Sequence, residues 1–209
     1  MAIFSAIQSR CAYLRGLSTW GTSSVDDTTI NSHINASILD IVNFFPFSWD
    51  RTTANLTLTA GVSNLPTDYN PKWGLYDARI GDNIFRQIDP VDKAIYSATD
   101  YVYWITYDNS NKVYVFNTPT QTGTVAIIYY FIPTALSGSS DVCLVPDPEA
   151  VAYLASSKMW IGDERNEALK MDYEQESQQR IKSLIQADAM IAPQAYEGTV
   201  VDLNNDLWQ

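Results

Sequence analysis

The chain of 209 residues is poor in the residue types that carry most enzyme chemistry. It has one histidine, His33, and two cysteines, Cys11 and Cys143, which lie far apart and lack the spacing of metal or redox sites. It contains no phosphate-binding, dinucleotide-binding, nucleophile-elbow or zinc-protease motif. We therefore expect no catalytic residue, no cofactor and no metal. We interpret His33 as part of a polar helix surface and both cysteines as buried thiols.

Positive charge and long apolar runs are also scarce. Against 24 acidic residues stand 13 basic ones, giving a formal net charge of −11. Binding the phosphate backbone needs clustered Lys and Arg, so the composition argues against a protein whose main task is to hold nucleic acid. No stretch approaches the ~20 apolar residues of a membrane span, and we expect no membrane partner.

Carboxylates are the one abundant group with catalytic potential, and their number alone leaves a glycosidase-like pair open. The nearest candidates are Asp89 with Asp92 and Asp163 with Glu164. Both pairs stand where a helix is expected to start, and capping explains them without chemistry. The chain also lacks the acidic loop of a calcium site.

Helical periodicity dominates the first 46 residues. Ile3, Ile7, Cys11 and Leu14 form one stripe, and Gly16 is a plausible end of that helix. A second helix starts at Ser24 and ends before Pro46. Its stripe consists of Ile30, Ile34, Ile38, Ile41 and Phe45.

The middle of the chain has the patterns of short strands. Residues 56–59 alternate, residues 72–88 suit two strands, and residues 124–132 suit one more. Asp89 and Pro90 favour a short helix from 89 to 97. The clearest hairpin joins residues 101–107 to 112–117. Because both faces of its first strand are apolar or aromatic, either the sheet is covered on both sides or one face meets a neighbouring subunit.

Helical periodicity returns from Pro148 to about Met190, with a break or bend at Gly162 and Asp163. Residues 191–209 have no periodicity and no basic residue, yet they retain apolar side chains that a solvating tail seldom needs. The predicted fold class is therefore α+β. A helical bundle (1–46 with 141–190) would carry an inserted antiparallel β-rich subdomain (47–140) and an extended C-terminal arm (191–209).

This layout resembles the head–tail connector adaptor proteins, also called head completion or gatekeeper-like proteins, of tailed bacteriophages. The order and spacing of the segments carry the resemblance, which covers most of residues 25–190. The matching segments are the helix Ile30–Phe45 running into Phe45-Pro46-Phe47-Ser48-Trp49, the strand and loop Leu56–Tyr69, the strand pair Val113–Pro119 and Ile127–Leu136, and the helix Asp147–Met190.

The resemblance implies a structural virion protein of the neck, assembled in the host cytoplasm. Its partners would be the portal protein, a downstream tail or nozzle protein, and copies of itself in a ring, expected to be a dodecamer. Genomic DNA would pass through the channel of this ring without sequence-specific binding. An acidic channel wall would repel the DNA backbone and let it slide.

Two sets of residues are the predicted contact sites, chosen by position and apolarity. The portal-binding set in the arm is Tyr196, Val200, Leu203, Leu207 and Trp208. The subunit or tail interface set in the hairpin is Tyr101, Tyr103, Trp104 and Tyr107. Two other functions remain open: another tail or baseplate component, and a carbohydrate-binding module that uses the aromatic sheet.

Overall fold

The computed structural model describes residues 2–17, 24–160 and 166–191. Helices lie at both ends of this chain and antiparallel sheets lie between them, which confirms the predicted α+β class. Packing divides it into two units, residues 1–49 with 133–209 and residues 50–132. The predicted arm, residues 191–209, lies outside the described residues apart from its first residue.

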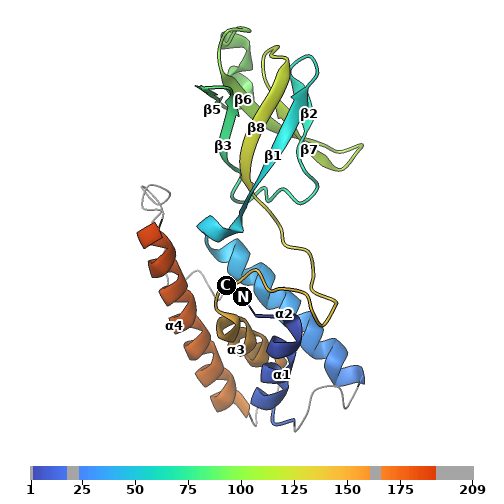
Figure 1. The fold of residues 1–209 in the computed structure, drawn as a ribbon, viewed down its shortest axis with the longest axis vertical. Coiled ribbons are helices and arrows are strands. Elements are labelled where there is room, and N and C mark those ends of the chain that lie inside the picture. Colours follow the sequence, from blue (N-terminus) through green and yellow to red (C-terminus); the bar gives the residue numbers. More distant parts are fainter. Residues whose placement is uncertain (1, 18–23, 161–165, 192–209) are drawn as a thin grey trace. The chain divides into compact units, whose positions relative to one another are not determined.

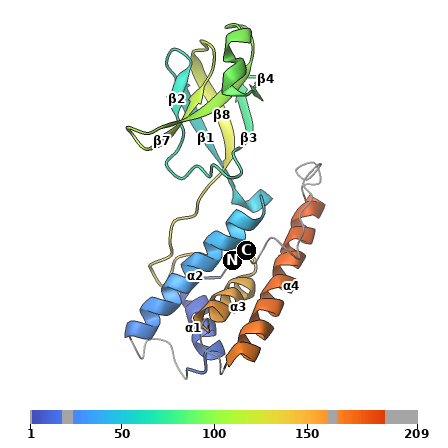
Figure 2. The same cartoon turned by 180° about the vertical axis from the view of Figure 1, so that it is seen from behind.

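The described residues of the first unit form four α-helices: α1 (Phe4–Leu14), α2 (Ser24–Phe44), α3 (Pro148–Met159) and α4 (Glu167–Ile191). Figure 1 shows α3 between the other three, and Figure 2 shows the same arrangement from behind. Alanine and serine dominate the buried face of α3, from Ala150 to Ser157, and allow neighbouring helices to approach closely. The C-terminal helical segment predicted from Pro148 to about Met190 consists of two helices, α3 and α4, and the break expected at Gly162 and Asp163 lies outside the described residues.

Periodicity located the buried face of α2 correctly. Its apolar residues (Ile30, Ile34, Ile38, Ile41) and the following Phe45 are all buried in the core of this unit. The stripe predicted for α1 needs one correction. Ile3 lies outside the helix, forms a β-bridge with Val142 and is exposed, whereas Phe4 is fully buried.

The segment that returns from the second unit is held by side-chain hydrogen bonds. The Asn35 amide on α2 both donates to the carbonyl of Leu136 at 3.0 Å and accepts from its N–H at 2.8 Å. The Asp141 carboxylate accepts from the N–H groups of Ser137 and Gly138, each at 2.8 Å. Those bonds lower the pKa of Asp141 and fix the loop before α3.

The second unit contains two four-stranded sheets. The first has the order β1 (Arg51–Leu58), β8 (Gly123–Tyr130), β3 (Leu75–Ile80), β4 (Asn83–Ile84). The second has the order β2 (Val62–Asn64), β7 (Val113–Asn117), β6 (Val102–Asp108), β5 (Arg86–Gln87). All pairs are antiparallel except the short β5–β6 pair. One shared core includes Leu56, Phe85, Phe116, Val125 and Ile127.

Two short 3-10 helices, η1 (Ser48–Asp50) and η2 (Pro90–Ile95), complete the elements. The prediction of a short helix after Asp89 is confirmed, because the Asp89 carboxylate accepts from the N–H of Val91 at 2.9 Å and Pro90 occupies the first turn. The predicted hairpin is also confirmed as β6 and β7. Asp108 fixes its turn by accepting from the N–H of Ser110 at 2.8 Å.

Candidate assembly surfaces

The four predicted interface residues of the hairpin lie in different surroundings. Tyr101 and Tyr107 are 39% and 45% exposed, and Trp104 is half-buried. Tyr103 is 5% exposed and stacks on Phe116 at 5.0 Å between ring centroids, so in this chain it is a core residue. Burial raises the pKa of the Tyr103 phenol to about 12, and its hydroxyl donates to the Gln87 side chain.

The predicted portal-binding residues of the arm, 196 to 208, lie outside the described residues. Helix α4, which leads toward them, ends in apolar side chains that no other described residue covers. Met190 is 85% exposed and Ile191 is 77% exposed at the C-terminal end of α4.

Tyr107 lines a surface feature that we name the aromatic groove. It consists of two hollows of about 360 and 350 Å³ that share Tyr69, Pro71 and Tyr114 as lining residues. Its rings are packed on one another: Tyr114 lies 4.9 Å from Tyr107 and 5.4 Å from Tyr69 between centroids. Lining residues of the groove include Pro66, Trp73, Val113, Lys72 and Lys112. The described lining contains no carboxylate.

Prolines and tyrosine contacts hold this groove in shape. Pro66 and Pro71 bracket the loop that carries Tyr69, and the N–H of Leu65 donates to the carbonyl of Tyr114 at 2.8 Å. Tyrosine and tryptophan give large contact area at low entropy cost, which is why they are enriched in protein interfaces. The arrangement suits contact with another protein.

A second surface, which we name the acidic knob, comprises residues 89–96 around η2. Its side chains project into solvent: Val91 is 86% exposed and Ile95 is 77% exposed. Two carboxylates, Asp89 and Asp92, accompany them with one cation, Lys93. Exposed apolar side chains on an ordered segment indicate a contact surface.

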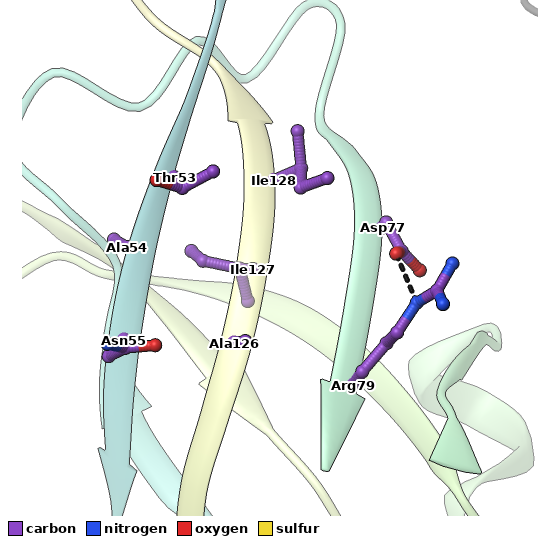
Figure 3. Close-up of a pocket in the computed structure, with 8 residues that line it drawn as sticks. All are labelled: Thr53, Ala54, Asn55, Asp77, Arg79, Ala126, Ile127 and Ile128. Atoms are coloured by element: carbon purple, nitrogen blue, oxygen red, sulfur yellow. Dashed lines mark hydrogen bonds and ion pairs between the residues drawn. The ribbon is translucent and has the colours of Figure 1, made fainter. Parts of the chain in front are cut away.

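A third hollow, of about 510 Å³, lies on the outer face of the first sheet (Figure 3). The strand register places Thr53, Ile128 and Asp77 in one row across β1, β8 and β3. Asp77 and Arg79 form an ion pair with each other at its edge. The described lining contains neither a histidine nor a cysteine. Its side chains are mostly small or apolar, and the charges of Asp77 and Arg79 at the edge neutralise each other.

Helices α1, α3 and α4 share a cluster of arginines and tyrosines. Arg10 donates to Glu149 at 2.9 Å and to the Tyr153 hydroxyl at 3.1 Å. Arg180 lies over the same Tyr153 ring at 5.5 Å and donates to Asp147 at 3.2 Å. These bonds connect the three helices, so the cluster has a structural role in the bundle.

The carboxylate of Asp50 is buried without a hydrogen-bond partner among the described residues. This holds for both of its oxygens, and the residue as a whole is fully buried. The neighbouring Arg51 guanidinium lies over the Tyr76 ring at 3.8 Å and donates to the Tyr130 hydroxyl at 3.1 Å. Burial alone raises the pKa of Asp50 to about 8, so this carboxyl is mostly protonated at neutral pH.

The residues that the sequence offered as candidates for catalysis or metal binding do not lie together in one site. His33 is half-buried on α2, and burial together with the cations Lys158 and Arg15 lowers its pKa. Asp89 caps η2, whereas Asp163 and Glu164 lie outside the described residues. Within the described ranges, no three His, Cys, Asp or Glu side chains gather as metal ligands. None of the described helices combines the length and apolar composition that crossing a bilayer requires.

Sequence reasoning missed the aromatic groove and the buried Asp50. The prolines and tyrosines of the groove were visible, but they come from two segments about forty positions apart and no spacing unites them. Asp50 stands next to the aromatic run from Phe45 to Trp49, and that neighbourhood was the only signal of its burial.

Comparison with known proteins yields a match over nearly the whole chain. The model of the SU10 adaptor protein family matches residues 5–197. No curated protein matches the chain. The matched range covers both helical segments and the whole β-rich unit, so the similarity extends over the described architecture. The chain therefore belongs to the SU10 adaptor protein family, a family of phage head–tail adaptors with a structural role.

Proposed function

We propose that this chain is a head–tail adaptor that forms a ring beneath the portal, extends the DNA channel and offers the platform on which the tail assembles. The observation that carries the proposal is the family match over residues 5–197. Repeated heterologous contacts between copies would close the ring, with the copy number of a dodecamer.

The two units would act as two domains, one that contacts the portal and one that contacts neighbouring copies and the tail. The helical unit would lie toward the portal, because α4 ends in exposed Met190 and Ile191 and leads into the arm. The arm would contact the portal through its apolar residues, raising the effective concentration of a second contact. Its proposed contact residues are Tyr196, Val200, Leu203, Leu207 and Trp208.

The β-rich unit would contact neighbouring copies and the next tail or nozzle protein. Tyr101, Trp104 and Tyr107 remain candidates for these contacts because their side chains reach the surface. Tyr103 would act from the core by supporting that surface through Phe116.

The net charge of −11 supports a channel that DNA passes without binding. A retardation assay with duplex DNA at low salt is expected to show no complex with the purified chain. A ring whose lumen is lined with Lys and Arg would contradict this part of the proposal.

The proposed function is tested by sedimentation of the chain with the portal ring of the same phage. We expect the full chain to co-sediment with the portal, and a variant ending at residue 191 to bind more weakly because it lacks the arm. A chain that stays at the top of the gradient whatever the portal concentration would contradict the proposal and favour another tail component.

A further inference from the structure

The chain carries two surfaces of complementary chemistry within one unit. The acidic knob presents Val91 and Ile95 beside Asp89 and Asp92. The aromatic groove presents tyrosine and proline side chains with the exposed Lys112 at its edge, and its described lining has no carboxylate. The knob has two carboxylates against one ammonium group, Lys93, whereas the described lining of the groove has two ammonium groups, Lys72 and Lys112, and no carboxylate. The two surfaces therefore match in polarity and carry opposite charge.

The two surfaces lie at opposite ends of strand β6. The knob precedes Val102, the first residue of β6, and Tyr107 and Lys112 stand at the other end, around the β6–β7 turn. Seven strand residues span roughly 20 Å at 3.3 Å per residue. Figures 1 and 2 both show η2 and the β6–β7 turn on opposite sides of this unit. The exposure of Val91 and Ile95 means that the knob does not fill the groove of its own chain.

The knob is ordered although none of its side chains is fully buried. Asp89 caps η2, and the Arg86 guanidinium donates to the Tyr96 hydroxyl at 3.0 Å. The segment after η2 is fixed as well, because Gln121 donates to the carbonyl of Asp100 at 2.6 Å and Asp100 accepts from the N–H of Ser97 at 2.7 Å. A segment already held in one conformation loses little entropy when it binds.

We infer that the acidic knob of one copy docks into the aromatic groove of the next copy, as the heterologous contact that links neighbouring subunits. The inference rests on the proposed ring, because a ring of identical copies requires each copy to present two different and mutually complementary surfaces. Val91 and Ile95 fill the hollow between Tyr107 and Pro66, and Asp92 faces Lys112.

Cysteine cross-linking in the portal-bound assembly tests this contact. One preparation carries Val91→Cys and another carries Tyr107→Cys, and a short bismaleimide is added to each alone and to their mixture on the portal ring. The native Cys11 and Cys143 are buried and do not compete. We expect a covalent dimer in the mixture only. A control mixture of Val91→Cys with Thr124→Cys, which is exposed on β8, is expected to give none.

Charge exchange gives a second readout on surface residues that do not disturb the core. Lys112→Glu and Asp92→Lys are each expected to weaken assembly on the portal by about tenfold, and the two together in one chain are expected to restore most of it. Asp82→Lys makes the same charge change on the exposed β3–β4 turn and is the matched control, expected to assemble normally.

The outcomes separate this inference from the proposed function. If the variants join the portal but the mixture gives no dimer, or if Val91→Cys cross-links to itself, the knob–groove contact is wrong and the adaptor role stands. If the wild-type chain does not join the portal at all, the adaptor role fails and the inference fails with it.

Discussion

Replacing Asp50 by asparagine should abolish a pH dependence of stability that the buried carboxyl imposes. In the folded chain this carboxyl has a pKa of about 8, whereas the ordinary value is 3.8. Folding therefore keeps a proton on Asp50 that the unfolded chain releases. The protonated Asp50 carboxyl contributes to the unfolding free energy in full below pH 4, and this contribution is lost as the pH rises toward 8.

The magnitude follows from the size of the pKa shift. Each pH unit between the two pKa values costs about 1.4 kcal/mol of unfolding free energy, so the loss approaches roughly 5 kcal/mol at pH 8. Water entry or a small local opening would reduce this to a few kcal/mol. Asparagine has nearly the same shape and no charge. Asp50→Asn should thus match the wild type near pH 4 and exceed it by about 2–5 kcal/mol at pH 8.

Urea denaturation at pH 4, 5, 6, 7 and 8, followed by tryptophan fluorescence, measures this difference. Other titrating groups, His33 among them, are common to both proteins and cancel in the comparison. Asp50→Ala is the control for lost volume. Because alanine also removes the carboxyl, its unfolding free energy should lie below that of Asp50→Asn by the same amount at every pH. An asparagine variant that is less stable than the wild type by the same amount at every pH would refute the reasoning, because it would mean that the carboxylate is ionised and bound to a partner.

Three further predictions follow from local geometry. Asp188→Ala on α4 removes the acceptor of two hydrogen bonds from Ser48, one of them at 2.8 Å from its N–H, and should cost about 2 kcal/mol in urea denaturation. Gly61→Ala should lower the melting temperature far more than Gly16→Ala. Both positions have positive φ, but a Cβ at 61 would lie 2.7 Å from a backbone oxygen whereas one at 16 would meet nothing within 4 Å. Cys11 and Cys143 should react with maleimide only after denaturation, because burial raises the pKa of both thiols; fast labelling of the native chain would contradict their burial.

Local periodicity was enough to predict the α-helices, whereas η2 was predicted from its cap and η1 was not predicted. The isoleucine stripe of α2 repeats at helical spacing, and every member is buried where the spacing predicted. The prediction that Ile3 lies on the buried stripe of α1 is wrong because Ile3 precedes the first turn of the helix and forms a β-bridge with Val142 instead. That contact joins residues far apart in sequence, and periodicity carries no information about it.

The sheet interior was harder to predict for the same reason. Tyr103 and Tyr107 lie four residues apart on β6 and therefore on the same face of the sheet, so strand alternation does not say which of the two is buried. Tyr103 is buried against Phe116 on β7, whereas Tyr107 packs on Tyr114, which in turn contacts Tyr69 in a loop about forty positions earlier in the sequence. Which side chains reach the surface of the sheet depends on such packing, so the sequence predicted the architecture, whereas the contact residues stay a prediction.

The copy number of this chain on the portal ring tests the central claim most directly, and native mass spectrometry of the purified complex measures it. The adaptor account predicts one discrete complex in which copies of this chain equal the portal subunits, twelve of each. A portal ring that retains its own mass beside free monomers of this chain would contradict the account.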